Sequence, residues 1–103
     1  MGKQFIKEAQ AMKKVTFFYL ENCPYCKQAR KALDELKAED AKYGTADMDW
    51  VEENSQPDIV AKYDYNYVPA MFIGEEKLYE ARPGEKYDEC KANVRRVLDA
   101  ALA

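Results

Sequence analysis

The chain alternates between segments with hydrophobic residues at helical spacing and short, uninterrupted hydrophobic runs. Residues 2–13 place their apolar side chains on one face, which predicts an amphipathic helix that packs on the core. Residues 15–20, VTFFYL, form a β-branched and aromatic run typical of a strand covered on both faces. Residues 28–39 return to helical spacing. We expect this helix to begin earlier, with Pro24 in its first turn, because proline suits that position.

The second half of the chain combines polar breaks with shorter hydrophobic segments. An apolar run and a weakly alternating segment, separated by Gly74-Glu75-Glu76, predict a β-hairpin. Pro83-Gly84 breaks the chain before a final stretch at helical spacing. The elements expected here are a strand over residues 43–48, a loop over 50–57, a short helix over 58–63, strands over 70–73 and 77–82, and a helix over 85–102.

The resulting order, α-β-α-β-α-β-β-α, indicates an α/β fold. Strands that alternate with helices pair in parallel through right-handed crossovers, and the hairpin adds an antiparallel edge. We therefore expect a four-stranded mixed sheet flanked by helices. A chain of 103 residues has room for one core, so residues 1–103 should form a single domain.

Composition narrows the location and the partners. The net charge of −3 is too mild to suggest nucleic acid or an anionic membrane as a partner. No apolar run approaches the ~20 residues that cross a bilayer, and residues 1–14 lack the central apolar stretch of a signal peptide. Three cysteines exclude a complete structural disulfide framework. We therefore expect a cytoplasmic monomer.

One tetrapeptide, Cys23-Pro24-Tyr25-Cys26, carries the candidate chemistry because it directly follows a predicted strand and opens a predicted helix. The N-terminus of a helix offers free N–H groups and the positive end of its dipole. Both favour a thiolate at Cys23, and the thiolate is the form that attacks disulfides. Cys26 follows about one helical turn later, where it can resolve the mixed disulfide. The sequence has no histidine, so Cys-His base catalysis is excluded.

A second motif, Val68-Pro69, opens the first strand of the predicted hairpin. Together with a Cys-x-x-Cys at a strand-to-helix junction, it makes the chain resemble the thioredoxin superfamily from Lys14 to Leu102. The resemblance implies a thioredoxin-like fold, here with an extra N-terminal helix, and thiol–disulfide oxidoreductase activity on protein or small-molecule disulfides. It also implies a cis Pro69 that faces the dithiol. The Val68 backbone would then lie beside the Cys23 sulfur and pair with an extended substrate.

Within this superfamily the sequence is mixed. Cys-Pro-Tyr-Cys is similar to the motif of dithiol glutaredoxins. Glutaredoxins, however, usually carry Lys or Arg three residues before the first cysteine and Gly-Gly at the start of the last helix, both contacting glutathione. This chain has Leu20 and a lone Gly84 at those positions, and Phe17 where thioredoxins place a buried acid. The resemblance therefore leaves two electron donors open, a reductase or glutathione as a co-substrate.

The remaining candidate site residues surround the dithiol. Tyr25 is expected to be exposed and to offer an aromatic surface to the substrate. Lys27 adds positive charge that would favour the Cys23 thiolate, unless its side chain simply points into solvent. The substrate-binding candidates are Pro24, Tyr25, Val68, Pro69 and Gly84.

Cys90 lies on the apolar stripe of the last helix, so we expect a buried, inert thiol. A zinc site that joins Cys23, Cys26 and Cys90 would lack a fourth ligand at the usual spacing. An iron–sulfur cluster bridging two chains, as in some glutaredoxin relatives, is disfavoured by Pro24 and by the weak glutathione site. We therefore expect no metal and no resident cofactor.

A non-catalytic alternative is a thioredoxin-fold module that keeps the dithiol and docks a dedicated partner. Exposed aromatic side chains would supply the docking surface in that case. The candidates are Tyr25, Trp50, Tyr65 and Tyr67.

Overall fold

The computed structural model describes residues 13–103. The helix expected over residues 2–13 therefore lies, except for its last residue, outside the described part. No helix within the described range is long and apolar enough to span a membrane.

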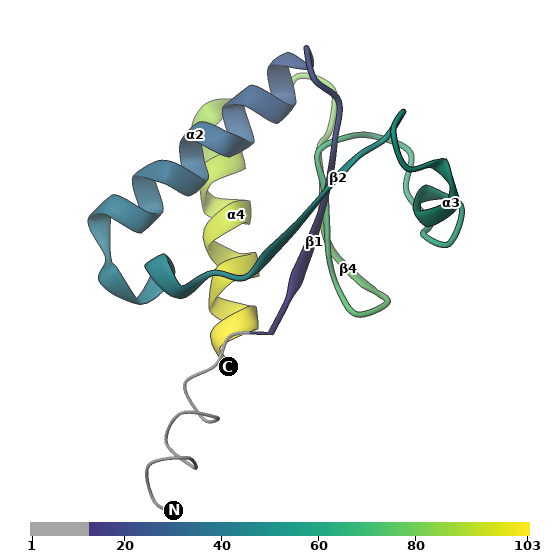
Figure 1. Cartoon of the computed structure of the whole chain (residues 1–103). Coiled ribbons are helices and arrows are strands. Elements are labelled where there is room, and N and C mark those ends of the chain that lie inside the picture. Colours follow the sequence, from purple (N-terminus) through teal and green to yellow (C-terminus); the bar gives the residue numbers. More distant parts are fainter. Residues whose placement is uncertain (1–12) are drawn as a thin grey trace, which may run out of the picture.

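Four strands form one mixed sheet in the order β2-β1-β3-β4 (Figure 1). β1 pairs in parallel with β2, β3 pairs antiparallel with β1, and β3 and β4 form the predicted antiparallel hairpin. The expected four-stranded mixed sheet is confirmed. The strands are β1 (Val15–Tyr19), β2 (Met48–Glu52), β3 (Ala70–Ile73) and β4 (Glu76–Glu80).

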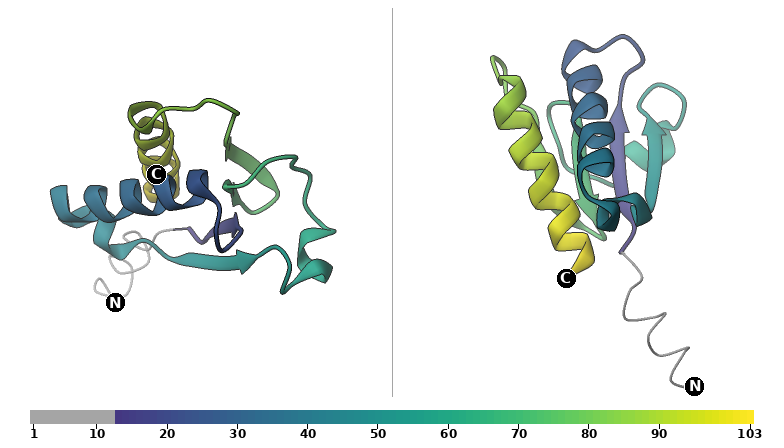
Figure 2. Two further views of the ribbon diagram at one scale, coloured as in Figure 1. Left: turned by 90° about the horizontal axis from the view of Figure 1, so that it is seen from above. Right: turned by 90° about the vertical axis from the view of Figure 1, so that its left-hand side faces the viewer.

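Helices cover both faces of the sheet, and the two long ones share one face. In both views of Figure 2, α2 (Pro24–Glu39) and α4 (Tyr87–Leu102) lie on one side and α3 (Pro57–Val60) on the other. Phe17 of β1 is fully buried toward α2 and α4, and Phe18 is fully buried toward the α3 side. The continuous apolar run of β1 therefore reflects a strand with no solvent-facing side.

α2 begins at the dithiol and buries one face along its length. Pro24 stands in its first turn, as expected, and the helix ends where the Asp40 N–H donates to the Leu36 carbonyl. Its buried side chains recur at helical spacing, which is the pattern of a helix packed on a core. They are Cys26, Ala29, Ala32, Leu33 and Leu36.

The prediction of a strand over residues 43–48 is wrong. Residues Ala41–Thr45 form a short 3₁₀ helix, η1, and the strand begins only at Met48. The Asp40 carboxylate caps η1 by accepting the Lys42 N–H, and the buried Tyr43 donates its hydroxyl to Asp99 of α4 at 2.6 Å. These polar contacts hold Tyr43 in a helical turn. The polar loop expected over residues 50–57 consequently begins after Glu52.

The other elements differ from expectation only at their ends. The short helix expected over residues 58–63 covers Pro57–Val60 and passes into turns. The second hairpin strand ends at Glu80, two residues early. The last helix begins at Tyr87, and Glu85 lies just before it as a buried carboxyl group.

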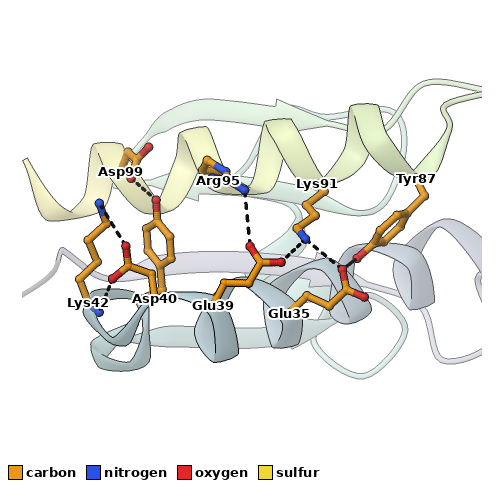
Figure 3. A network of polar contacts seen from close by, with 9 residues as sticks. Glu35, Glu39, Asp40, Lys42, Tyr87, Lys91, Arg95 and Asp99 are labelled. Carbon is orange, nitrogen blue, oxygen red and sulfur yellow. Dashed lines mark hydrogen bonds and ion pairs between the residues drawn. The ribbon is translucent and has the colours of Figure 1, made fainter.

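Polar contacts along the seam between α2 and α4 add to the apolar contact of the two helices (Figure 3). Lys91 of α4 lies 3.1 Å from Glu35 and 2.6 Å from Glu39, and the Tyr87 hydroxyl donates to Glu35. Arg95 lies 3.7 Å from the other Glu39 oxygen. Such partly exposed pairs contribute little individually, but together they fix the position of α4 along α2. The turn before α4 is thereby held near the start of α2.

Candidate active site

Cys23 lies between β1 and α2, at the position that caps the helix. Its carbonyl oxygen accepts the Lys27 N–H at 3.0 Å. Pro24 is exposed beside it, and no acidic side chain in the first turn offsets the positive end of the helix dipole. Cys23 is half-buried, so its sulfur combines the helix terminus with access to solvent. An accessible cysteine at a helix N-terminus is the usual setting of a reactive thiol.

Cys26 lies one turn further and is 2% exposed. Burial raises the pKa of the Cys26 thiol to about 12, and the adjacent Cys23 sulfur acts in the same direction. The two thiols are free in this structure, so it represents the reduced dithiol. The environments of the two sulfurs therefore suit different roles, an accessible nucleophile and a protonated thiol held in reserve.

The Val68-Pro69 peptide bond is cis, as the resemblance implies. The Cys23 Sγ lies 3.8 Å from the Val68 carbonyl oxygen, close enough for a weak thiol hydrogen bond. Pro69 is buried, and its carbonyl oxygen accepts the Ala81 N–H at 3.0 Å. The structure thus brings the second motif into contact with the first across 45 residues of sequence.

The loop before Val68 is held by a carboxylate from the neighbouring strand. One oxygen of Glu80 accepts the backbone N–H groups of Asn66 and Tyr67, the latter at 2.7 Å. Although burial opposes it, the Lys77 ammonium and these two N–H groups hold the pKa of the Glu80 carboxyl below its usual range. Glu80 thereby positions the backbone that reaches the Cys23 sulfur.

Tyr25 is half-buried against the main core, so the expectation of an exposed aromatic surface is wrong. Its hydroxyl oxygen accepts the Gly84 N–H at 2.6 Å. Gly84 has φ +85°, a left-handed conformation that favours glycine. The structure therefore brings Gly84 into contact with Tyr25 of the tetrapeptide, and this contact occupies the Gly84 N–H group.

The other candidates contribute unequally. Lys27 is exposed, and no ion pair between described residues involves it. Of the aromatic docking candidates, Trp50 and Tyr67 are exposed. Tyr65 is half-buried against Phe18 and donates its hydroxyl to Glu53 at 2.7 Å. Of the four aromatic residues expected to form a docking surface, two are therefore exposed to solvent.

A cavity of about 410 Å³ is lined in part by Cys23, and we call it the Cys23 cavity. It lies where the ends of β1 and β2 run side by side, since Tyr19 pairs with Glu52 in the parallel register. Its lining residues are Leu20, Glu21, Asn22, Cys23, Glu52 and Asn54.

Comparison with known proteins identifies the family. The glutaredoxin family model matches residues 15–78, more than half of the chain, including the dithiol and Val68-Pro69. The chain belongs to the glutaredoxin family. No match was found among curated proteins.

The fold of this glutaredoxin-family chain is thioredoxin-like. It is similar to the crystal structure of Trxlp from Edwardsiella tarda EIB202, at 15% identity and a TM-score of 0.55, covering 88% of this chain and 91% of that one. It is also similar to the structure of thioredoxin 1 from the thermophilic eubacterium Thermosipho africanus TCF52B, at 16% identity and a TM-score of 0.54. The match covers 87% of this chain and 99% of that one. These structures support the thioredoxin-like fold inferred from the two motifs.

The third cysteine of this glutaredoxin-family chain is part of the core. Cys90 is fully buried in α4, where its sulfur lies 3.5 Å from the Tyr79 hydroxyl, and burial raises the pKa of its thiol. The expected buried position is confirmed. Across residues 13–103, no group of three or more His, Cys, Asp or Glu side chains is arranged to hold a metal ion.

Sequence reasoning did not single out the acidic residues at this glutaredoxin-family site. Glu21 and Glu52 line the Cys23 cavity, and Glu80 holds the loop before Val68. Glu52 was expected in a loop because the strand before it was misplaced. The sequence MDWVE gave little signal, because it does not alternate regularly and only Val51 in it is fully buried.

Proposed function

We propose that the chain is a thiol–disulfide oxidoreductase that reduces protein or small-molecule disulfides through a Cys23/Cys26 dithiol–disulfide cycle. The observation that carries this proposal is the geometry of the dithiol. The Cys23 sulfur is accessible at the start of α2, 3.8 Å from the Val68 carbonyl oxygen, and Cys26 is buried one turn further. Membership of the glutaredoxin family supports the same class of reaction.

The cycle uses only the two cysteines. The Cys23 thiolate attacks one sulfur of the substrate disulfide, forms a mixed disulfide and expels the other sulfur as a thiolate. Cys26 then loses its proton to that thiolate or to water and attacks the Cys23 sulfur. The Cys23–Cys26 disulfide forms, and the substrate leaves as two thiols. A thiol or dithiol donor returns the protein to its reduced form.

The backbone beside Cys23 is suited to hold a substrate chain. No hydrogen bond between described residues uses the Val68 N–H, and the Val68 carbonyl oxygen has only the weak contact with Cys23. An extended segment of a substrate can therefore pair with both groups, in the manner of an added β-strand. Such pairing would align a substrate disulfide with the Cys23 sulfur.

Two electron donors remain as candidates. Family membership favours glutathione, whereas Leu20 and the lone Gly84 lack the glutathione-contacting groups implied by the resemblance. We place the protein in the cytoplasm as a monomer, without a resident cofactor, acting on disulfide-containing proteins.

Two assays run side by side test the proposal. Reduction of insulin with dithiothreitol but not of the glutathione–hydroxyethyl mixed disulfide indicates a reductase of the thioredoxin type. The opposite result indicates a glutathione-dependent enzyme. Cys23→Ser should abolish either activity, and Cys90→Ala, which alters a buried thiol outside the dithiol, should retain it. Activity in neither assay would overturn the proposal in favour of a non-catalytic docking module.

A further inference from the structure

The Cys23 cavity is lined by charges of one sign. Its two charged lining residues, Glu21 and Glu52, are both acidic, and no basic residue among residues 13–103 lines it. Both glutamates border the same space as Cys23. A group that enters beside the sulfur therefore meets negative potential.

The nearby basic side chains do not neutralise this lining. Lys27 is exposed and lies outside the cavity lining. The Arg30 guanidinium lies over the rings of Tyr19 and Trp50, 4.6 and 5.0 Å from their centroids. The Arg30 charge is thus directed toward the aromatic rings of β1 and β2.

Glu52 is held in a defined position. It pairs with Tyr19 in the β1–β2 register, and the next residue, Glu53, donates its N–H to the Tyr19 carbonyl at 2.9 Å. The Glu52 carboxylate itself accepts the Ser55 N–H at 2.8 Å. These contacts fix the position of Glu52 in the cavity lining.

We propose that the Cys23 cavity selects disulfides in which a lysine or arginine lies within two residues of the reacting cysteine, and disfavours anionic disulfides such as glutathione disulfide. This inference rests on the proposed oxidoreductase function and adds its substrate class. Attraction between the basic side chain and the two carboxylates favours the encounter, and a carboxylate on the substrate is repelled. The exchange reaction itself is unchanged, because the basic residue takes no part in bond formation.

Three disulfide-linked peptides that differ only in the residue after the cysteine test this selection. The residue is Lys, Gln or Glu, and dithiothreitol regenerates the protein, with its direct reaction subtracted. We expect kcat/KM to follow the order Lys, Gln, Glu, with about a tenfold ratio between the extremes for charge pairs at a partly exposed site. The ratio should fall as salt is added, because exposed charges are screened.

Variants locate the selection at the cavity. The Glu21→Gln/Glu52→Gln double variant should bring the Lys-to-Glu peptide ratio close to one, and the single Glu21→Gln variant, at an exposed position, should reduce it in part. Glu75→Gln is the matched control, because this exposed glutamate lines a different cavity, formed with Phe72 and Lys77. Glu75→Gln removes one negative charge outside the Cys23 cavity. It should leave the Lys-to-Glu peptide ratio at its wild-type value.

The outcomes separate this inference from the function on which it rests. Equal rates for the three peptides, or a ratio that survives in the double variant, would overturn the charge selection while leaving the oxidoreductase intact. A loss of selection in Glu75→Gln as well would show that net charge, not the cavity, is responsible, and would overturn it too. No reduction of any peptide would overturn the proposed function and this inference together.

Discussion

Cys23 and Cys26 belong to one tetrapeptide but have different surroundings. Cys23 caps α2 at a half-buried position, whereas Cys26 faces the core and is 2% exposed. The difference in exposure follows from their positions on the helix. Cys26 lies three residues after Cys23, on the same face of the helix but deeper in the protein. The tetrapeptide alone predicts two thiols, and the packing around it decides which one meets a substrate.

At pH 8, iodoacetamide should alkylate the reduced native protein once, at Cys23. Cys26 has its pKa raised to about 12 by burial, so it stays a protonated, unreactive thiol until the pH approaches that value. Cys90 is fully buried. Mass spectrometry after digestion measures the sites. All 3 cysteines should react in denaturant, and rapid double labelling of the native protein would contradict this prediction.

Tyr25→Phe should destabilise the protein by about 1 kcal/mol, because the Gly84 N–H loses its hydrogen-bond acceptor. Urea unfolding measures the change. Tyr67→Phe is the matched control, since Tyr67 is 53% exposed and its loss of a hydroxyl should leave the free energy of unfolding nearly unchanged. Equal effects of the two changes would show that the Tyr25–Gly84 contact contributes nothing to stability.

At the scale of elements, the loop before β3 depends on β4. Glu80 reaches from β4 to the N–H groups of Asn66 and Tyr67, and this contact fixes the backbone that leads to Val68. The hairpin therefore does more than complete the sheet. It supplies the side chain that holds the substrate-facing loop beside the dithiol.

Glu80→Gln should lower the free energy of unfolding by about 1–2 kcal/mol at pH 7, because a charge-assisted acceptor of two N–H groups is lost. The folded protein lowers the Glu80 pKa from its ordinary value of 4.5, so the ionised group stabilises the fold above that pH. The contribution is lost as the pH falls through the lowered pKa. The difference in free energy of unfolding between the wild-type protein and Glu80→Gln should therefore become smaller in acid. Unfolding measured at several pH values tests this.

Glu76→Gln serves as the control for that experiment, because Glu76 is an exposed residue at the other end of the same strand. It should shift stability only slightly at any pH. A gap for Glu80→Gln that is constant from neutral to acid pH would argue against the role of its charge.

The sequence predicted β1 and α2 well and β2 poorly, for physical reasons that lie in their surroundings. β1 is buried on both faces, so its residues must all be apolar, and α2 carries its apolar face at regular spacing. β2 is an edge strand with one fully buried residue, Val51, and its hydrophobic signal is weak. The region before it was misassigned because the hydroxyl of Tyr43 bonds to Asp99, 56 residues away.

At the scale of the whole molecule, the core between the sheet and the two long helices extends from the dithiol to the far end of α2. Leu36 is fully buried near the end of α2, ten residues after Cys26, which corresponds to about 15 Å along a helix. Stability and chemistry can therefore be changed independently at the two ends of this helix.

Leu36→Ala should lower the free energy of unfolding by about 2–5 kcal/mol, because it leaves a cavity in the core. Reduction of a disulfide substrate at 25 °C should be retained as long as the variant remains folded. Asp34→Ala, at an exposed position of the same helix, should change stability by no more than about 0.5 kcal/mol. Circular dichroism during urea unfolding measures both variants, and a large loss in Asp34→Ala would contradict this picture.

The candidate site was predictable as far as its residues lie in motifs. Cys23 and Cys26 were identified by spacing and context, and Val68 and Pro69 through the resemblance to the thioredoxin superfamily. The structure brings Val68 to the Cys23 sulfur. The acidic lining could not be foreseen, because Glu52 borders Cys23 only through the pairing of β1 with β2. That register is a property of the folded sheet and leaves no mark in the local sequence.

Among residues 13–103, β2 has a hydrogen-bonded neighbour on one side only, so no described strand covers its other backbone edge. Such edges are where proteins polymerise into extended sheets. In this molecule the edge is five residues long and carries the carboxylates of Asp49 and Glu52. Two copies that met along it would bring these like charges together, and their repulsion would oppose such a pairing.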